Sequence, residues 1–115
     1  MKLDRNINGN GKGKYALVRL RGIEDGGEAA MLLLRLAKLG HVDWGAVGGR
    51  DEFFVVKLRD KYAPAAIKGY SDAAADDARK EPDEARSRDK FQWAIQVQGL
   101  GDRAGTLSPF CKEPD

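Results

Sequence analysis

The sequence contains one cysteine and one histidine, and this scarcity limits the chemistry that the chain could perform. Cys111 has no second cysteine with which to form an intramolecular disulfide, which fits a reducing compartment. One cysteine and one histidine also cannot supply the ligands of a zinc site. His41 has no positioned partner, which a general base needs, and Cys111 has no histidine near it in the sequence. We therefore predict no catalytic residue, no metal and no cofactor, and a protein that is not an enzyme.

Long apolar runs and a large excess of one charge are also missing. No stretch of 18 apolar residues occurs, and the basic start Met1–Arg5 is not followed by the apolar segment of a signal peptide. The chain has 20 basic and 18 acidic residues, a net charge of +2, whereas a protein that coats nucleic acid is usually far more basic. We expect a cytoplasmic protein without a membrane span and without direct DNA binding.

What the chain does contain suits one small folded domain. Its 115 residues are 42% hydrophobic and 33% charged, in the range of globular proteins that build their own core. Glycine and asparagine gather in residues 1–14, where their tolerance of positive φ predicts a flexible arm. Residues 15–105 are predicted to form a single α+β domain, and residues 106–115, with two prolines, an extended tail.

Three segments have the composition and the period of β-strands. Residues 15–21 and 53–59 are rich in β-branched and aromatic side chains and alternate in polarity. Residues 42–47 precede Gly48–Gly49, and two such segments joined through paired glycines are typical of a β-hairpin. The sequence therefore predicts a small antiparallel sheet.

Two helices are predicted between and after these strands. Leucines recur on one face over residues 28–39, and Gly40 is a typical helix stop. The second helix is expected over residues 61–80, with Asp60 as its cap and Pro82 beyond its end. The predicted order is β-α-β-β-α, with the helices on the sheet.

The last third of the chain supports two interpretations. Residues 91–98 alternate in polarity, which predicts a fourth strand and a ferredoxin-like fold. Residues 83–103 can also form one long helix that makes a C-terminal helical hairpin with the helix before it. Gly99 and Gly101 disfavour that helix. The sequence pattern leaves both open.

A basic face with aromatic side chains is the candidate binding site. If the first and third strands are neighbours, alternate residues of each project from one face of the sheet. Such a face could stack a base and hold phosphate, or accept an acidic protein surface. The plainer interpretation is an open sheet face whose long side chains are solvated. The residues of this face are Tyr15, Arg19, Arg21, Phe53, Lys57 and Arg59.

Three stretches resemble small accessory proteins encoded in bacteriophage and prophage genomes. They are Asn8–Arg21, Asp51–Pro64 and Asp102–Asp115, which together cover both ends and the middle of the chain. The resemblance carries no motif of assigned function, so it assigns no residue a role. It implies a helix before Asp102.

Small phage proteins of this kind often counter host defence, which the resemblance implies for this chain by association. The first expectation is a non-enzymatic inhibitor that binds a host defence protein, as anti-CRISPR proteins do. The alternative is a sponge that sequesters a cyclic-nucleotide immune signal, as anti-Thoeris and anti-CBASS proteins do. The sponge would hold its ligand between the subunits of a homo-oligomer.

Overall fold

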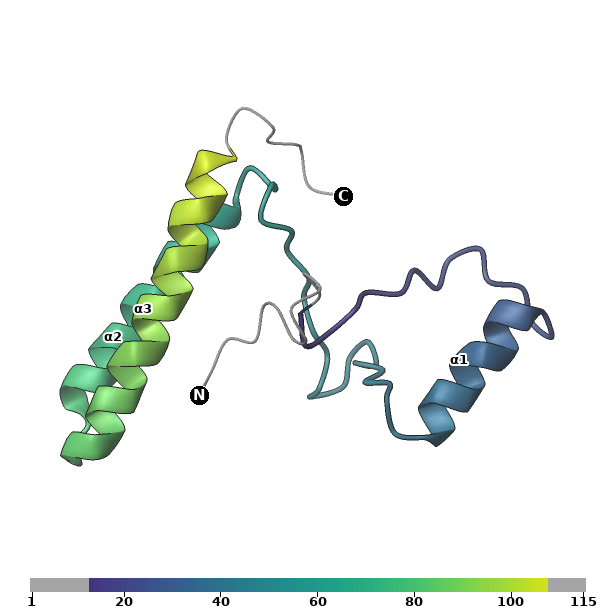
Figure 1. Cartoon of the computed structure of the whole chain (residues 1–115), viewed down its shortest axis with the longest axis horizontal. Helices are drawn as coiled ribbons and strands as arrows, with labels where there is room; N and C mark the ends of the chain where they lie inside the picture. The colour runs from purple at the N-terminus through teal and green to yellow at the C-terminus, as the bar shows by residue number, and fades with distance from the viewer. Residues whose placement is uncertain (1–12, 108–115) are drawn as a thin grey trace.

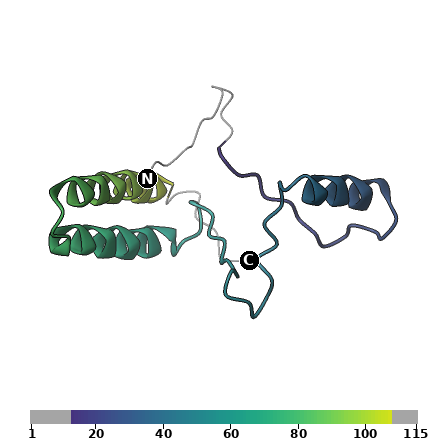
Figure 2. The same cartoon turned by 90° about the horizontal axis from the view of Figure 1, so that it is seen from below.

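A computed structural model describes residues 13–107, and within them the regular structure is entirely α-helical. Helix α1 spans Glu28–Lys38, α2 spans Ala63–Lys80 and α3 spans Glu84–Thr106. Helices α2 and α3 lie side by side as an antiparallel hairpin, whereas α1 stands apart from both (Figures 1 and 2). Residues 1–12 and 108–115, which hold most of the expected arm and tail, lie outside the described residues.

The prediction of an α+β fold with a small antiparallel sheet is wrong. The three expected strands, residues 15–21, 42–47 and 53–59, are irregular segments, and the described part of the chain has only an isolated bridge position at Asp60. Hydrogen bonds within these segments are local, such as Gly49 N–H to the Ala46 carbonyl at 3.0 Å. Alternating polarity describes side chains that fit a pleated, half-buried surface, but a strand also needs a neighbour to pair with. No such pairing forms between the described segments, so these residues do not form strands despite their alternating polarity.

The two expected helices are present with slightly different bounds. Gly40 follows α1 with φ of 82°, and His41 N–H donates to the Leu36 carbonyl at 3.0 Å, so the helix stops where the sequence predicted. Helix α2 begins at Ala63 rather than at residue 61. Asp60 does not cap it, because the Asp60 carboxylate accepts from Tyr62 N–H at 2.8 Å, ahead of the first turn.

The predicted strand over residues 91–98 is also wrong, and with it the ferredoxin-like order. These residues lie in the middle of α3, which Asp83 caps by accepting from Arg86 N–H at 3.1 Å. The long helix forms despite Gly99 and Gly101, because packing against α2 outweighs the low helix propensity of glycine. It does so in an all-α fold rather than beside a sheet.

Small side chains make up the core of the hairpin. In the described chain, the buried residues are Ala63, Ser71, Ala78, Ala94, Val97 and Ala104. Alanine lets two helices approach closely, and a Cβ added at Gly101 would come within 3.2 Å of Ile67 Cγ2. The two helices of the hairpin therefore pack closely, and their larger side chains lie around the edges of the contact between them.

Polar contacts close the hairpin at its turn. Lys90 Nζ lies 2.7 Å from a carboxylate oxygen of Glu81 and 3.0 Å from one of Asp77. The Ser87 hydroxyl donates to the Ala78 carbonyl at 2.7 Å. These contacts join α2 to the start of α3 across the turn.

The chain before the hairpin buries little of itself. None of the described residues before Ala63 is buried. The radius of gyration is 17.5 Å, against about 13 Å for a compact chain of this length. The N-terminal half, by which we mean residues 13–59, accordingly lacks a core of its own.

Candidate interaction surface

The structure does not assemble the predicted basic face. The irregular segment before α1 carries Tyr15, Arg19 and Arg21. The other three residues of the face, Phe53, Lys57 and Arg59, lie on the segment before α2. No hydrogen bond or ion pair joins the two sets within residues 13–107. Without a sheet, alternation along each segment does not place these side chains on one face. All six residues are nevertheless exposed: Tyr15, Arg19, Arg21, Phe53, Lys57 and Arg59.

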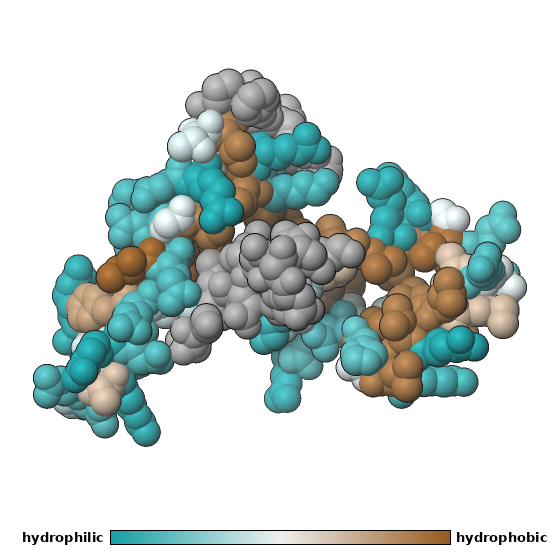
Figure 3. Space-filling view, viewed as in Figure 1, coloured by the Kyte–Doolittle hydropathy of each residue, from teal (hydrophilic) through white to brown (hydrophobic). Residues whose placement is uncertain are grey.

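Exposed apolar side chains are the dominant feature of the N-terminal half. Leu17 is 68% exposed, Phe54 is 90% and Val47 is 94%. Figure 3 shows apolar residues gathered over the α1 end of the molecule, whereas the hairpin end is mostly hydrophilic. The large apolar residues of this half that remain exposed are Tyr15, Leu17, Val18, Leu20, Met31, Leu32, Leu34, Leu36, Leu39, Trp44, Val47, Phe53, Phe54, Val55 and Val56.

We call this set the apolar surface. Soluble monomers rarely expose a contiguous apolar patch of more than a few hundred Å², and larger ones mark interaction sites. Ten of these fifteen side chains lie in the three segments that were predicted as strands, so a sheet was expected where the structure has an exposed surface. The β-like composition was visible, but the absence of a covering layer was not.

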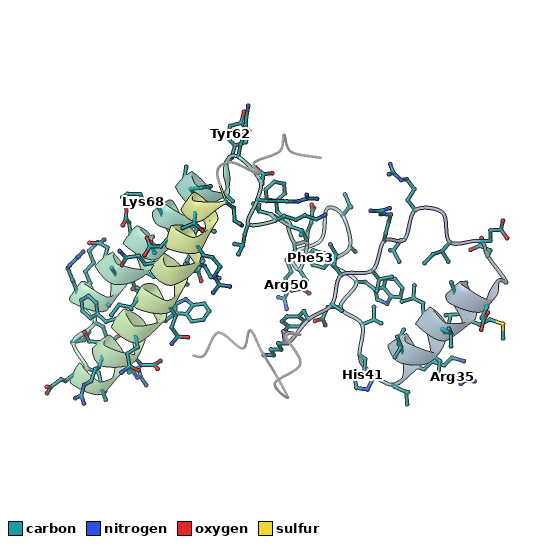
Figure 4. All side chains as sticks on the ribbon, turned by 45° about the horizontal axis from the view of Figure 1, so that its top comes forward. Arg35, His41, Arg50, Phe53, Tyr62 and Lys68 are labelled. Carbon is teal, nitrogen blue, oxygen red and sulfur yellow. The ribbon has the colours of Figure 1, made fainter. Side chains whose placement is uncertain are left out.

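A shallow depression lies in the loop between α1 and α2. Its volume is about 590 Å³, and Trp44, Arg50 and Phe53 line it together with Asp43 and Asp51. The Phe53 ring lies against the backbone of Gly45, where any side chain would overlap it. Figure 4 shows Arg50 and Phe53 in this central loop.

Of the three residues Trp44, Arg50 and Phe53, only Phe53 was among the binding residues predicted from the sequence. The signal was the Gly48–Gly49 turn, which brings the residues on its two sides together even though it joins no strands. Gly48 has φ of 83°, and its N–H donates to the Glu52 carboxylate at 2.8 Å. This turn holds the depression in shape.

The hairpin offers a second, more polar groove of about 420 Å³ between α2 and α3. Lys68 and Asp72 line it and form an exposed ion pair at 2.7 Å. The hydrogen bond that Lys68 Nζ donates to the Asp72 carboxylate raises the pKa of Lys68 above its usual 10.5. On the opposite edge Trp93 Nε1–H donates to the Tyr70 hydroxyl at 3.2 Å. Exposed pairs of this kind contribute little to stability or binding.

A scan against protein-family models, a search of curated proteins and a search of solved structures each return no match. No relative therefore lends this surface a function, and the likeness to phage proteins stays a prediction.

The described residues contain no cluster of three or more histidine, cysteine or acidic side chains that could hold a metal ion. His41 is exposed beside α1, and Cys111 lies outside the described residues. No helix within 13–107 is long and apolar enough to cross a membrane. What the arrangement offers chemically is an apolar surface with basic side chains beside it.

Proposed function

We propose that this chain is a non-enzymatic binding protein whose N-terminal half docks on a partner protein. The apolar surface carries this proposal. An interface of standard size removes about 800 Å² from each partner. The fifteen large apolar side chains of the apolar surface are between 36% and 94% exposed and are available for such an interface. Covering the apolar surface with another protein would remove these side chains from water, which is the main favourable term in protein association.

The charges beside the apolar surface indicate what kind of partner fits it. Arg19 and Arg21 alternate with exposed apolar residues before α1, and Lys57 and Arg59 follow Val55 before α2. Interfaces commonly have an apolar centre and a polar rim, with complementary charge on the two sides. The partner we propose therefore presents an apolar patch bordered by acidic residues.

The resemblance to phage accessory proteins selects a host defence protein as the target. An inhibitor of this kind acts by occluding a surface that the defence protein needs, as anti-CRISPR proteins do, and requires no chemistry of its own. The proposal that the chain is not an enzyme rests on the same reasoning.

The experiment compares single aspartate substitutions at two aliphatic residues of similar exposure. Leu17 lies on the apolar surface, and Ile95 lies on α3 with 64% of its side chain exposed. The chain is produced in bacteria that carry a defined defence system, and phage plating is counted. The defence protein is then purified and its affinity for each variant is measured.

We expect the wild type and Ile95→Asp to restore phage plating and bind the purified defence protein, and Leu17→Asp to lose both. The pair Arg19→Glu with Lys57→Glu should weaken binding without lowering the melting temperature. Equal binding by Leu17→Asp and Ile95→Asp would show that the apolar surface is not the docking site.

The sponge is the second candidate, and the depression at Trp44, Arg50 and Phe53 is the observation that favours it. Aromatic rings stack on bases, and arginine pairs with phosphate. Asp43 and Asp51 line the same depression and disfavour an anionic ligand, so we rank this function second. A thermal-shift screen against cyclic nucleotides tests it, because a ligand that binds only the folded protein raises its melting temperature. A shift of several degrees with one nucleotide would reverse the ranking.

A further inference from the structure

Helix α1 is too short and too exposed to be stable by itself. It has 11 residues, all described and none buried, whereas isolated helices shorter than about 12–15 residues are marginal in water. It makes no contact with α2 or α3. Its stability must therefore come from packing that one copy of the described chain does not supply.

The chain covers only one side of α1. Ala30, Leu33 and Ala37 share a face by their spacing and are half-buried. A different set of apolar side chains stays in solvent. Leu32 is 52% exposed, and Leu36 and the C-cap residue Leu39 are similar at 46% and 66%.

These exposed leucines follow the spacing of a coiled-coil seam. Ala29, Leu32, Leu36 and Leu39 are separated by three, four and three residues, which is the a-d-a-d pattern of a heptad repeat. We call them the leucine row. A seam of this pattern fits the matching seam of another helix, and Figure 3 shows an apolar patch at the α1 end of the molecule.

The charges along α1 point to a second copy as the occupant. Glu24, Asp25 and Glu28 lie at or just before its first turn, and Arg35 and Lys38 lie in its last turn. In an antiparallel pair the acidic end of each helix lies beside the basic end of the other, and the two-fold axis repeats this contact at both ends of the pair. The two helix dipoles then point in opposite directions, which is the favourable arrangement. A parallel pair would place like charges together.

Pairing through α1 leaves room for the partner protein. Ten of the fifteen residues of the apolar surface lie outside α1 and its C-cap residue, on the segments before α1 and before α2.

We propose that the leucine row of α1 pairs antiparallel with the leucine row of a second copy about a two-fold axis, at the centre of a homodimer interface. The leucine row is the part of the apolar surface that lies on α1, whereas the partner protein is proposed to dock on the part beside the basic residues, at Leu17 and Val55. The two proposals can therefore fail independently.

The first experiment measures the mass of the full chain in solution by light scattering after gel filtration. The wild type should have twice the chain mass of 12.6 kDa. Leu36→Glu places a charge in the leucine row, and Leu34→Glu makes the same change at a residue that is 58% exposed on the opposite side of α1. Leu36→Glu should weaken dimerisation at least about 30-fold more than Leu34→Glu, as expected for a residue at an interface centre.

A monomeric wild type, or equal dimerisation by the two variants, would overturn the proposal. A monomer would indicate instead that α1 packs on its own hairpin or on the partner protein. Because Leu36→Glu affects only the leucine row, it should still bind the defence protein, whereas Leu17→Asp should still dimerise. Loss of both activities in one variant, with loss of helical circular dichroism, would indicate unfolding, and the next experiment decides that case.

The second experiment uses single cysteines in a Cys111→Ser background, with Leu32→Cys in one chain and Leu36→Cys in a differently tagged chain. Antiparallel pairing places these two positions opposite each other, so the mixed disulfide should form in preference to either homodimer. A preference for the two homodimers would show parallel pairing, and no cross-linking at either position would exclude the leucine row.

Discussion

Replacing Gly101 by alanine tests how closely α2 and α3 approach each other, and Gly99 provides a matched control on the same helix. A Cβ at Gly101 would lie 3.2 Å from Ile67 Cγ2 and 3.7 Å from Ile67 Cβ. A Cβ at Gly99 would meet nothing within 4 Å. Both glycines are interior to α3, so the intrinsic helix preference for alanine is the same at both.

The expected magnitudes follow from these distances. Alanine is favoured over glycine inside a helix by about 1 kcal/mol, so Gly99→Ala should raise the free energy of unfolding by that amount. Carbon atoms prefer about 3.5–4.0 Å, and overpacking costs about 1–3 kcal/mol. Gly101→Ala should therefore range from neutral to about 2 kcal/mol less stable than the wild type.

Urea unfolding followed by circular dichroism at a fixed protein concentration measures both variants. An Ile67→Ala background removes the Cγ2 atom, and there Gly101→Ala should recover the gain that Gly99→Ala shows. If Gly101→Ala stabilises the wild type as much as Gly99→Ala does, the helices do not pack closely at this position and the reasoning is refuted.

Three further predictions concern the hairpin, and urea unfolding tests each. Asp83→Ala removes the side-chain cap of α3 and should cost about 1 kcal/mol; an unchanged midpoint would mean that solvent replaces the cap. Ala78→Leu places a large side chain at a fully buried position and should cost about 1–3 kcal/mol, whereas Ala73→Leu on the exposed side of α2 should change stability by less than about 0.5 kcal/mol. The hydrogen bond that Lys90 Nζ donates to the Glu81 carboxylate lowers the pKa of Glu81 from 4.5 and raises the pKa of Lys90 from 10.5. Stability should fall as the pH drops below 4.5, because the unfolded chain protonates Glu81 more readily than the folded chain does. Stability should also fall as the pH rises above 10.5, because the unfolded chain releases the Lys90 proton more readily. A Lys90→Gln variant should flatten both limbs.

The candidate site shows where sequence reasoning reached its limit. The residues selected for it, Arg19 and Lys57 among them, are exposed as expected, because charged side chains are costly to bury whatever the fold. Their arrangement on one face depended on a sheet that does not form. Trp44 and Arg50 were missed because the local turn that gathers them was interpreted only as a strand connector.

The amino-acid sequence alone determined the local features that short-range interactions set. The leucine period and Gly40 predicted α1, and the segment that Pro82 ends predicted α2. Stops, turns and caps depend on backbone sterics and on hydrogen bonds between residues a few positions apart, so they can be read from neighbours in the chain.

The tertiary structure decided whether each segment had something to pair with. Residues 91–98 have the alternation of a strand but form part of α3, because Ala94 and Val97 can bury against α2 in that conformation. Residues 15–21 and 53–59 have the composition of strands but lie unpaired in the described chain. A strand is stabilised by residues distant in sequence, whereas a helix satisfies its own backbone hydrogen bonds, so only the three-dimensional arrangement could separate the two outcomes.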